Sequence, residues 1–186
     1  QDWWSGLVGP GDLFDTEKYF VICVNMLGSC YGSDGPSSIN PETGRPYFFS
    51  YPKITVRDIV NAEIIIRKHL EISKVDVLVG ASIGGFQTLE WAIMEPDAID
   101  KTIIIGCSCR VSPWLTAFEE SQRMALRADA SFTAAESLES GKAGLECARS
   151  LALLSYRRRE GYNATQSETD DDVMFADRAG SYQRYQ

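Results

Sequence analysis

The segment that most constrains the fold is residues 75–91, VDVLVGASIGGFQTLEW. Residues 75–79 form a short, largely apolar and β-branched run, which predicts a buried parallel strand. Residues 86–94 contain helix formers with apolar positions at helical spacing, which predicts a helix. The intervening sequence, GASIG, fits the G-x-S-x-G pattern of a strained strand-to-helix turn that lifts a nucleophilic serine above the edge of a sheet. We therefore predict Ser82 at the carboxyl end of a strand. The alternative is a glycine-rich turn without chemistry.

A serine hydroxyl is a weak nucleophile at neutral pH and needs a neighbouring general base, most often a histidine. The chain has one histidine, His69. It is predicted at the C-terminal end of the helix that precedes strand 75–79. At ~3.3 Å per residue, five or six strand residues separate His69 from Ser82 by roughly 17 to 20 Å. We predict that His69 is a surface residue favoured by the helix C-terminus, and that the base for Ser82 is missing from this chain.

Composition excludes several classes of protein. The 186 residues, 44% of them hydrophobic, are enough for one globular domain with a sizeable core. No apolar run approaches the ~20 residues that cross a membrane. The net charge of -8 argues against binding to nucleic acid, which needs a basic face. The start without Met and without a signal-peptide pattern indicates the middle of a longer chain.

The five cysteines have no regular spacing. Cys23 and Cys107 fall in apolar, strand-like runs, where free thiols behave as small buried hydrophobes. The pair Cys107 and Cys109 lacks a second Cys/His pair at a zinc-like spacing. We therefore expect a cytoplasmic protein with free thiols and no metal site.

The order of predicted elements indicates a parallel sheet flanked by helices. Thr55 and Asp58 are spaced as a near capping box, which predicts the start of a helix. The long segment 27–52, rich in Gly, Ser and Pro, is predicted to be an ordered loop. The predicted strands are residues 19–26, 75–79 and 101–107, and the last of these is a continuous apolar run that we expect to be buried. The predicted helices between them are residues 55–70 and 86–94. Such alternation is typical of doubly wound α/β folds, whose sites lie at the carboxyl ends of strands.

After Ser112 the predicted strands stop. Pro113 is expected to start a helix that runs to about Arg127, residues 131–156 are predicted to be helical, and residues 166–172 form a polar, acidic loop. We interpret residues 1–112 as part of an α/β core and residues 113–186 as part of a helical cap.

The chain resembles the homoserine O-acetyltransferases, α/β-hydrolase-fold enzymes of methionine biosynthesis. The similar stretches are DWW with GLVGPG in residues 2–11, YFVIC in 19–23, NMLGSCYGS in 25–33, GPSS in 35–38 up to Pro41, GASIGG with LEW in 80–91, and Gln122-Arg123. The stretch 25–41 is the most specific, because ordinary esterases do not carry it.

The resemblance implies an α/β-hydrolase fold with part of a helical cap, and it implies roles for four residues. Ser82 matches the acyl-accepting nucleophile, and the backbone N–H of Ile83 matches one oxyanion donor. Arg149 and Tyr156 match two substrate-tunnel residues. They are seven positions apart, nearly two helical turns, so they share one helix face ~10 Å apart along its axis. The family's second oxyanion donor precedes the position of Gln1, and its acid and histidine follow Gln186.

The implied reaction moves an acetyl group from acetyl-CoA to the hydroxyl of L-homoserine through an ester on Ser82. Acetyl-CoA is a co-substrate, and no cofactor is expected. The resemblance also implies a cytoplasmic homodimer joined through the cap helices, without a nucleic-acid or membrane partner, and this fragment alone is expected to be inactive. Relatives that transfer succinyl groups or accept serine share these motifs. Two other classes stay open: a serine hydrolase that passes the acyl group to water, and a non-catalytic chain.

Overall fold

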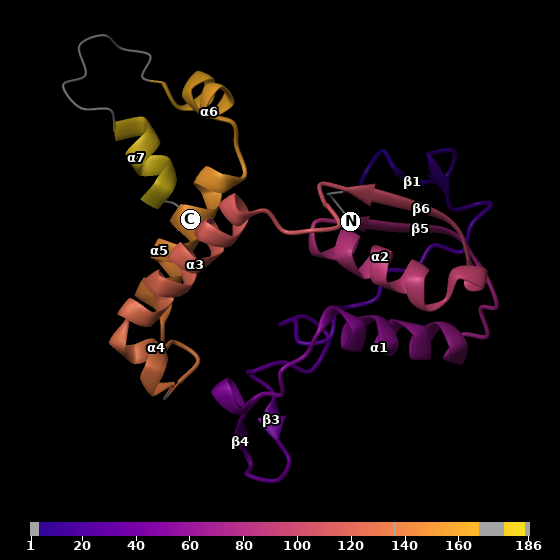
Figure 1. Ribbon diagram of the computed structural model, residues 1–186, viewed down its shortest axis with the longest axis horizontal. Coiled ribbons are helices and arrows are strands. Elements are labelled where there is room, and N and C mark those ends of the chain that lie inside the picture. The colour runs from indigo at the N-terminus through magenta and orange to yellow at the C-terminus, as the bar shows by residue number, and fades with distance from the viewer. Residues whose placement is uncertain (1–3, 136, 168–176, 185–186) are drawn as a thin grey trace. The chain divides into compact units, whose positions relative to one another are not determined.

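The computed structural model describes residues 4–135, 137–167 and 177–184 (Figure 1). The chain forms two compact units. The first consists of Gln1–Gly80 with Gln87–Ile103, and the second consists of Ala81–Phe86 with Ile104–Gln186. The boundary expected near residue 112 stays a prediction.

Helix α1, Val56–His69, begins at the predicted capping box. The Thr55 hydroxyl accepts a hydrogen bond from the Asp58 N–H, and the Asp58 carboxylate accepts one from the Thr55 N–H at 2.7 Å. These two bonds satisfy N–H groups that the first turn of a helix leaves without partners. The predicted helix is therefore confirmed, together with its N-terminal signal.

The predicted strand-turn-helix is confirmed as strand β5, Val75–Ala81, and helix α2, Ile83–Met94. The expected burial of residues 75–79 is wrong, because they are only partly buried or exposed. After the short 3-10 helix η2, Pro96–Ala98, the chain enters strand β6, Ile99–Ile105, which pairs with β5. The two arrows point the same way in Figure 1, as a crossover through α2 requires. The core consists of Val60, Ile64 and Trp91, against which Val56, Leu78, Met94 and Ile99 pack.

A buried ion pair ties α1 to the end of α2. Arg67 donates through Nη2 to both carboxylate oxygens of Glu95, at 3.0 and 3.1 Å, and through Nη1 to the carbonyls of Ile72 and Ser73. The Trp91 indole N–H also donates to Glu95, at 3.1 Å. Desolvation raises the pKa of Glu95, but the hydrogen bonds from Trp91 and Arg67 outweigh it and lower that pKa overall. The network fixes the turn from which β5 starts.

The segment before α1 is an ordered loop held by backbone hydrogen bonds. Its short elements are the parallel pair β1 (Val8–Gly9) and β2 (Phe14–Asp15), the antiparallel pair β3 (Ile39–Asn40) and β4 (Arg45–Pro46), and the 3-10 helix η1 (Phe48–Ser50). The Tyr51 hydroxyl donates to the Asp34 carbonyl at 2.8 Å, and the Gly28 N–H donates to the same oxygen at 2.9 Å.

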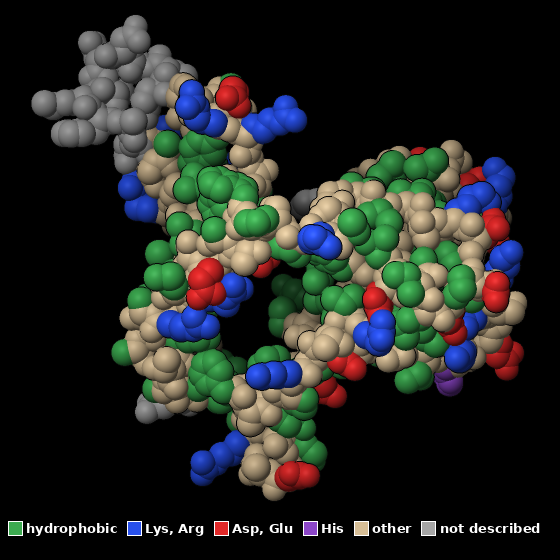
Figure 2. All heavy atoms as spheres, viewed as in Figure 1, with side chains coloured by type: hydrophobic (Ala, Val, Ile, Leu, Met, Phe, Trp, Pro, Cys, Tyr) green, Lys and Arg blue, Asp and Glu red, His purple; other side chains and the backbone are tan. Residues whose placement is uncertain are grey.

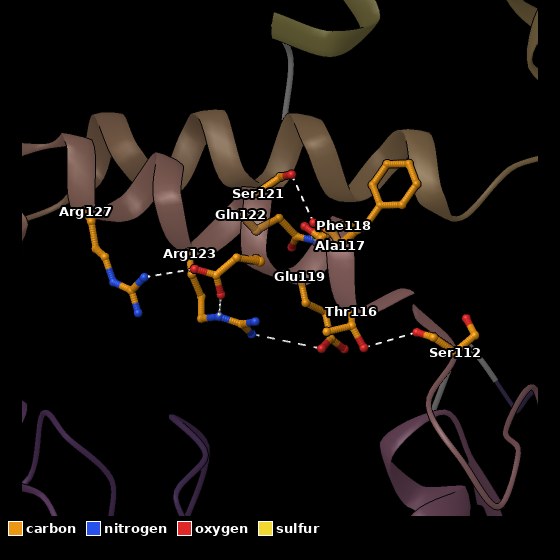
Figure 3. Close-up of polar contacts among 10 residues, drawn as sticks. Ser112, Thr116, Ala117, Phe118, Glu119, Ser121, Gln122, Arg123 and Arg127 are labelled. Carbon is orange, nitrogen blue, oxygen red and sulfur yellow. Dashed lines mark hydrogen bonds and ion pairs between the residues drawn. The ribbon is translucent and has the colours of Figure 1, made fainter. Parts of the chain in front are cut away.

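The remaining described elements are helical. They are α3 (Pro113–Ala128), α4 (Ala130–Ala134), α5 (Lys142–Ser155), α6 (Arg159–Gln166) and α7 (Asp177–Arg184). As predicted, α3 begins at Pro113, where the Ser112 hydroxyl accepts a hydrogen bond from the Leu115 N–H. Figure 3 shows the polar side of α3, where Arg123 reaches toward Glu119 and Gln122 donates to the Phe118 carbonyl.

Helix α5 packs closely on α3 through small residues. Gly144, Ala148 and Ala152 are its buried positions. A Cβ at Gly144 would lie 2.9 Å from the carbonyl oxygen of Ala125 and 3.0 Å from Cα of Leu126, both on α3. Only glycine allows the two backbones to approach this closely.

Three predictions about these elements are wrong. Residues 19–26 form no strand, because the described part of the chain offers them no partner strand, and Phe20 is 76% exposed. Cys23 is exposed and Cys107 is only partly buried. Strand β6 is not buried either, with Ile103 to Ile105 37 to 47% exposed.

The helix predicted over residues 131–156 is interrupted between α4 and α5. Ala135 and Gly141 adopt left-handed backbone conformations, with φ of 49° and 84°. Such angles end one helix and precede the next. Of the acidic loop predicted at residues 166–172, residues 168–172 lie outside the described residues.

Candidate functional site

Ser82 lies between the last residue of β5 and the first residue of α2. Its φ is +52°, and its side chain is exposed. A positive φ is uncommon for a residue with a Cβ, and where it occurs it often marks a functional position. The backbone of Ser82 thus has the strained geometry that the G-x-S-x-G pattern predicts.

The neighbouring strand and helix hold this strained turn in place. The Ser82 N–H donates to the Ile105 carbonyl at 2.9 Å, and the Gly85 N–H donates to the Ser82 carbonyl at 2.9 Å. A Cβ on Gly85 would lie 2.5 Å from Cβ of Cys107, so this position requires glycine. Around Gly84, in contrast, a Cβ would meet nothing within 4 Å. Of these two glycines, Gly85 is therefore the one that lets the turn approach the chain after β6.

Ile83 is the first residue of α2. The first N–H groups of an α-helix have no intrahelical acceptor, and they carry the positive end of the helix dipole. An N–H at this position, one residue after Ser82, can stabilise negative charge that develops on a substrate oxygen. The oxyanion role of Ile83 stays a prediction.

The described structure places no general base at Ser82. His69 is the last residue of α1 and is exposed, as predicted, and the seven residues of β5 lie between it and Ser82 in the chain. Among the described residues, no hydrogen bond to the Ser82 hydroxyl is present.

Arg149 and Tyr156 belong to α5 and to its C-terminal cap. Both side chains are exposed, Tyr156 by 73%. No ion pair joins Arg149 to Glu146, three residues earlier on α5, among the described residues. The described contacts do not link Ser82 to Arg149 or Tyr156, and the substrate-binding roles of the two remain predictions.

Sequence reasoning missed Glu63, a buried carboxyl on α1. Its side chain is 8% exposed, and burial raises its pKa to about 7. It lines a cavity of about 220 Å³ with Val24, Asn25, Leu27, Gly32, Ser33, Ile59, Ala62 and Ile66. One signal could have found it: Glu63 follows Val60 by three residues and precedes Arg67 by four, which puts it on the buried face of the helix.

Two further observations concern metals and membranes. In the ranges that the structure describes, no three His, Cys, Asp or Glu side chains gather in a way that could hold a metal ion. None of the helices in the described part of the chain combines the length and the apolar character that crossing a bilayer requires.

Comparison with known proteins connects this site to a family. The family model described as alpha/beta hydrolase fold matches residues 2–170. A curated homoserine O-acetyltransferase of Cyclobacterium marinum is 43% identical over 188 residues, which cover 100% of this chain and 52% of that protein. The chain therefore spans about half the length of this relative. The resemblance predicted from the sequence is confirmed.

Solved structures share the fold. The homoserine O-acetyltransferase from Bacillus anthracis superposes with a TM-score of 0.87 at 24% identity, covering 98% of this chain and 54% of that one. Esterase E22 gives the same TM-score and coverage at 27% identity. The family model matches most of the chain, and the structure carries the strained serine between a strand and a helix. The chain belongs to the α/β-hydrolase fold family.

Proposed function

We propose that Ser82 is the nucleophile of a homoserine O-acetyltransferase. The observation that carries the proposal is the strained serine between β5 and α2 in a chain that is 43% identical to a protein of that name. Strain at a single exposed serine costs stability, which suggests that function maintains it.

In the proposed first half-reaction, Oγ of Ser82 attacks the carbonyl carbon of the acetyl thioester. A general base takes the hydroxyl proton, and the tetrahedral intermediate places its negative oxygen near the N–H of Ile83. The C–S bond then breaks, CoA leaves as the protonated thiol, and an acetyl ester remains on Ser82. We assign the base to a residue outside these 186, because the one histidine of the chain, His69, ends α1 and precedes all of β5 in the sequence.

In the second half-reaction, the hydroxyl of L-homoserine attacks the ester carbonyl. The general base takes the proton of that hydroxyl and returns it to Oγ of Ser82 as the C–O bond to Ser82 breaks, and O-acetylhomoserine leaves. L-homoserine is a zwitterion, so its carboxylate must be held away from the reacting end. The exposed guanidinium of Arg149 offers two parallel hydrogen bonds to a carboxylate, and the Tyr156 hydroxyl offers a further donor.

A second candidate function is ester hydrolysis, favoured by the similarity to esterase E22 at a TM-score of 0.87. The same Ser82 ester would then be attacked by water. The higher identity to the curated acetyltransferase favours transfer over hydrolysis.

We also propose a cytoplasmic homodimer that associates through α3 and α5. Exposed apolar side chains on these helices, Leu115, Met124 and Leu145, support this assembly. Sedimentation at micromolar concentration would show twice the monomer mass, and a monomer would contradict this part of the proposal.

The test uses protein expressed from the complete reading frame and acetyl-CoA without homoserine. The intact mass should rise by one acetyl group, and Ser82→Ala should abolish the increase. Adding homoserine should discharge the ester to O-acetylhomoserine, whereas free acetate would indicate the esterase. Normal turnover in the Ser82→Ala variant would overturn the proposal. The 186-residue chain alone should show no steady turnover.

A further inference from the structure

A pocket of about 440 Å³ lies within the helical part of the second unit, in the size range of small-molecule sites. Helices α3, α5 and α6 and the residues between them supply its lining, which consists of Trp114, Phe118, Leu154, Ser155, Arg157, Arg159, Tyr162 and Asn163. Neither Arg149 nor Tyr156 is among the lining residues. The two residues proposed to bind the acceptor therefore do not line this pocket, and Tyr156 lies in the chain between its lining residues Ser155 and Arg157.

One wall of the pocket is aromatic. The rings of Trp114 and Phe118 meet edge to face, with centroids 5.0 Å apart. The Trp114 side chain is 74% exposed, so much of its indole surface is available to a ligand. An open indole face is a platform on which a planar heteroaromatic ring can stack.

The other wall is cationic. Arg157 and Arg159 line the pocket, and no carboxylate is among its eight described lining residues. Arg157 is held in place because its Nη2 donates to the Tyr182 hydroxyl at 2.7 Å and its Cζ lies 5.3 Å from the centre of that ring. A guanidinium has five N–H donors, so Arg157 keeps others for a ligand. Figure 2 shows Lys and Arg side chains over α6 beside a patch of hydrophobic side chains.

An aromatic wall beside two guanidinium groups matches a ligand that joins a planar base to phosphates. Guanidinium groups bind phosphate oxygens through paired hydrogen bonds. Asn163 adds an amide that can donate and accept hydrogen bonds, as the edge of a base requires. A zwitterionic amino acid would leave the aromatic wall unused.

We propose that this pocket binds the adenosine 3′,5′-bisphosphate part of the acyl donor. The inference rests on the proposed function, because acetyl-CoA is the donor in that reaction. Trp114 stacks on the adenine, and Arg157 and Arg159 bind the phosphates. The pantetheine arm of CoA separates this nucleotide from the thioester, so a nucleotide site apart from Ser82 agrees with the donor's chemistry.

The test measures binding by calorimetry to protein from the complete reading frame. The probes are adenosine 3′,5′-bisphosphate, adenosine, inorganic pyrophosphate, ADP and CoA. The double variant Arg157→Gln with Arg159→Gln should weaken the binding of adenosine 3′,5′-bisphosphate and of pyrophosphate by at least ~10-fold. Trp114→Leu should weaken the binding of adenosine 3′,5′-bisphosphate by at least ~5-fold and leave the affinity for pyrophosphate unchanged, because only the adenine base stacks on Trp114.

The matched control removes two exposed positive charges from the first unit, Arg45→Gln with Lys53→Gln. It should change each affinity less than twofold. An equal loss in this control would show a general effect of charge and overturn the proposal, as would unchanged binding in the arginine double variant. ADP binding tightly while CoA does not bind would assign the pocket to free nucleotides and also overturn it.

Two readouts separate this inference from the proposed function. If the inference holds, the arginine double variant raises KM for acetyl-CoA and leaves the rate of Ser82 acetylation at saturation within about twofold. If Ser82 is never acetylated while the binding pattern above appears, the acetyltransferase proposal fails and the nucleotide pocket stands. If Ser82 is acetylated and neither Arg157 nor Arg159 affects KM or nucleotide binding, only the pocket proposal fails.

Discussion

The chain contains two regions that are stabilised in different ways. The core region, residues 56–105 with α1, β5, α2 and β6, buries large side chains, namely Val60, Ile64 and Trp91. The helical region, residues 113–184, buries small ones, Gly144, Ala148 and Ala152 on α5. The first region therefore gains more from hydrophobic burial, while the second depends on close approach of two helix backbones.

Their charged groups differ in the same way. In the core region the Arg67 side chain is 8% exposed and pairs with a Glu95 side chain that is 19% exposed. In the helical region Arg123 and Arg127 pair with Glu120, and these three side chains are 45 to 60% exposed. Exposed pairs contribute little, whereas a buried pair is costly to break. A serine held in a strained conformation needs stable surroundings. Ser82 directly follows β5, which belongs to the core region.

The largest expected effect tests the buried pair. Arg67→Ala should lower the free energy of unfolding by about 3 kcal/mol, because it removes the Arg67 donor from two backbone carbonyls and from the Glu95 carboxylate, which keeps only the Trp91 N–H and the exposed Lys68. Chemical denaturation at pH 7 measures the change. Arg123→Ala, the control in the helical region, should cost less than about 1 kcal/mol. Equal losses of unfolding free energy in the two variants would contradict the proposed difference between the core region and the helical region.

The next effect concerns the helical region and activity. Arg149→Lys in the complete protein should slow transfer to homoserine by ~10- to 100-fold, or ~1.4 to 3 kcal/mol, because an ammonium holds a carboxylate without aiming it. Acetylation of Ser82 by acetyl-CoA should change much less. Rapid-quench measurement of both half-reactions shows which step the substitution slows, with Arg123→Lys as a control. Equal slowing of both steps would show that Arg149 is not the acceptor clamp.

Close approach of α5 to α3 can be tested with one methyl group. Gly144→Ala should destabilise the protein by about 1 to 3 kcal/mol, because the new Cβ would meet backbone atoms of α3 at 2.9 to 3.0 Å. Gly161→Ala is the matched control, because a Cβ there meets nothing within 4 Å and alanine favours a helix. Thermal melts should show opposite signs for the two variants. A stable Gly144→Ala protein would mean that the two helices separate at little cost.

The smallest expected effect depends on pH and belongs to the core region. Burial raises the pKa of Glu63 from its ordinary value of 4.5 to about 7, so between these values the folded protein binds up to one more proton than the unfolded chain. Stability should therefore fall as pH rises from about 4.5 to 7 and then level off. After allowance for solvent screening, Glu63→Gln should be more stable than the wild type by about 1 to 2 kcal/mol at pH 8 and nearly equal at pH 4.5.

Exposed Glu42→Gln is the control for this titration, and it should leave the pH profile unchanged. A Glu63→Gln profile with the same slope as the wild type would show that the carboxyl ionises freely in the folded protein.

Local signals in the sequence predicted the elements that position Ser82. Two helix starts are defined by hydrogen bonds between residues three positions apart. These are the capping box of Thr55 and Asp58 and the N-terminal cap at Ser112. The run before Gly80 and the helix after Ser82 followed from periodicity and from the glycines. At the two helix starts the deciding hydrogen bonds lie within a few residues of one another, which is why the sequence alone was sufficient there, whereas β5 also needs β6 as its partner strand.

The failures depend on interactions between distant residues. Residues 19–26 have strand composition, but a strand exists only when a partner supplies its hydrogen bonds. The environment of Glu63 depends on a cavity closed by the loop around Asn25 and Ser33, more than 25 positions earlier in the chain. The lining of the nucleotide pocket joins Trp114 to Arg157 and Arg159 in the same way. Sequence composition cannot reveal contacts between residues that lie far apart in the chain.

The positive φ of Ser82 also has a consequence for how this protein can evolve. A left-handed backbone angle costs a residue with a Cβ roughly 1 to 2 kcal/mol, and glycine escapes that cost. Selection for thermal stability alone would therefore favour glycine at position 82, at the expense of the hydroxyl. A library screened only for heat resistance should accumulate Ser82→Gly among its survivors. Under the proposed function, a library of the complete reading frame in cells that depend on it for methionine should retain serine. The rate at which glycine replaces serine in the first library would show how strongly the positive φ at position 82 destabilises the folded protein.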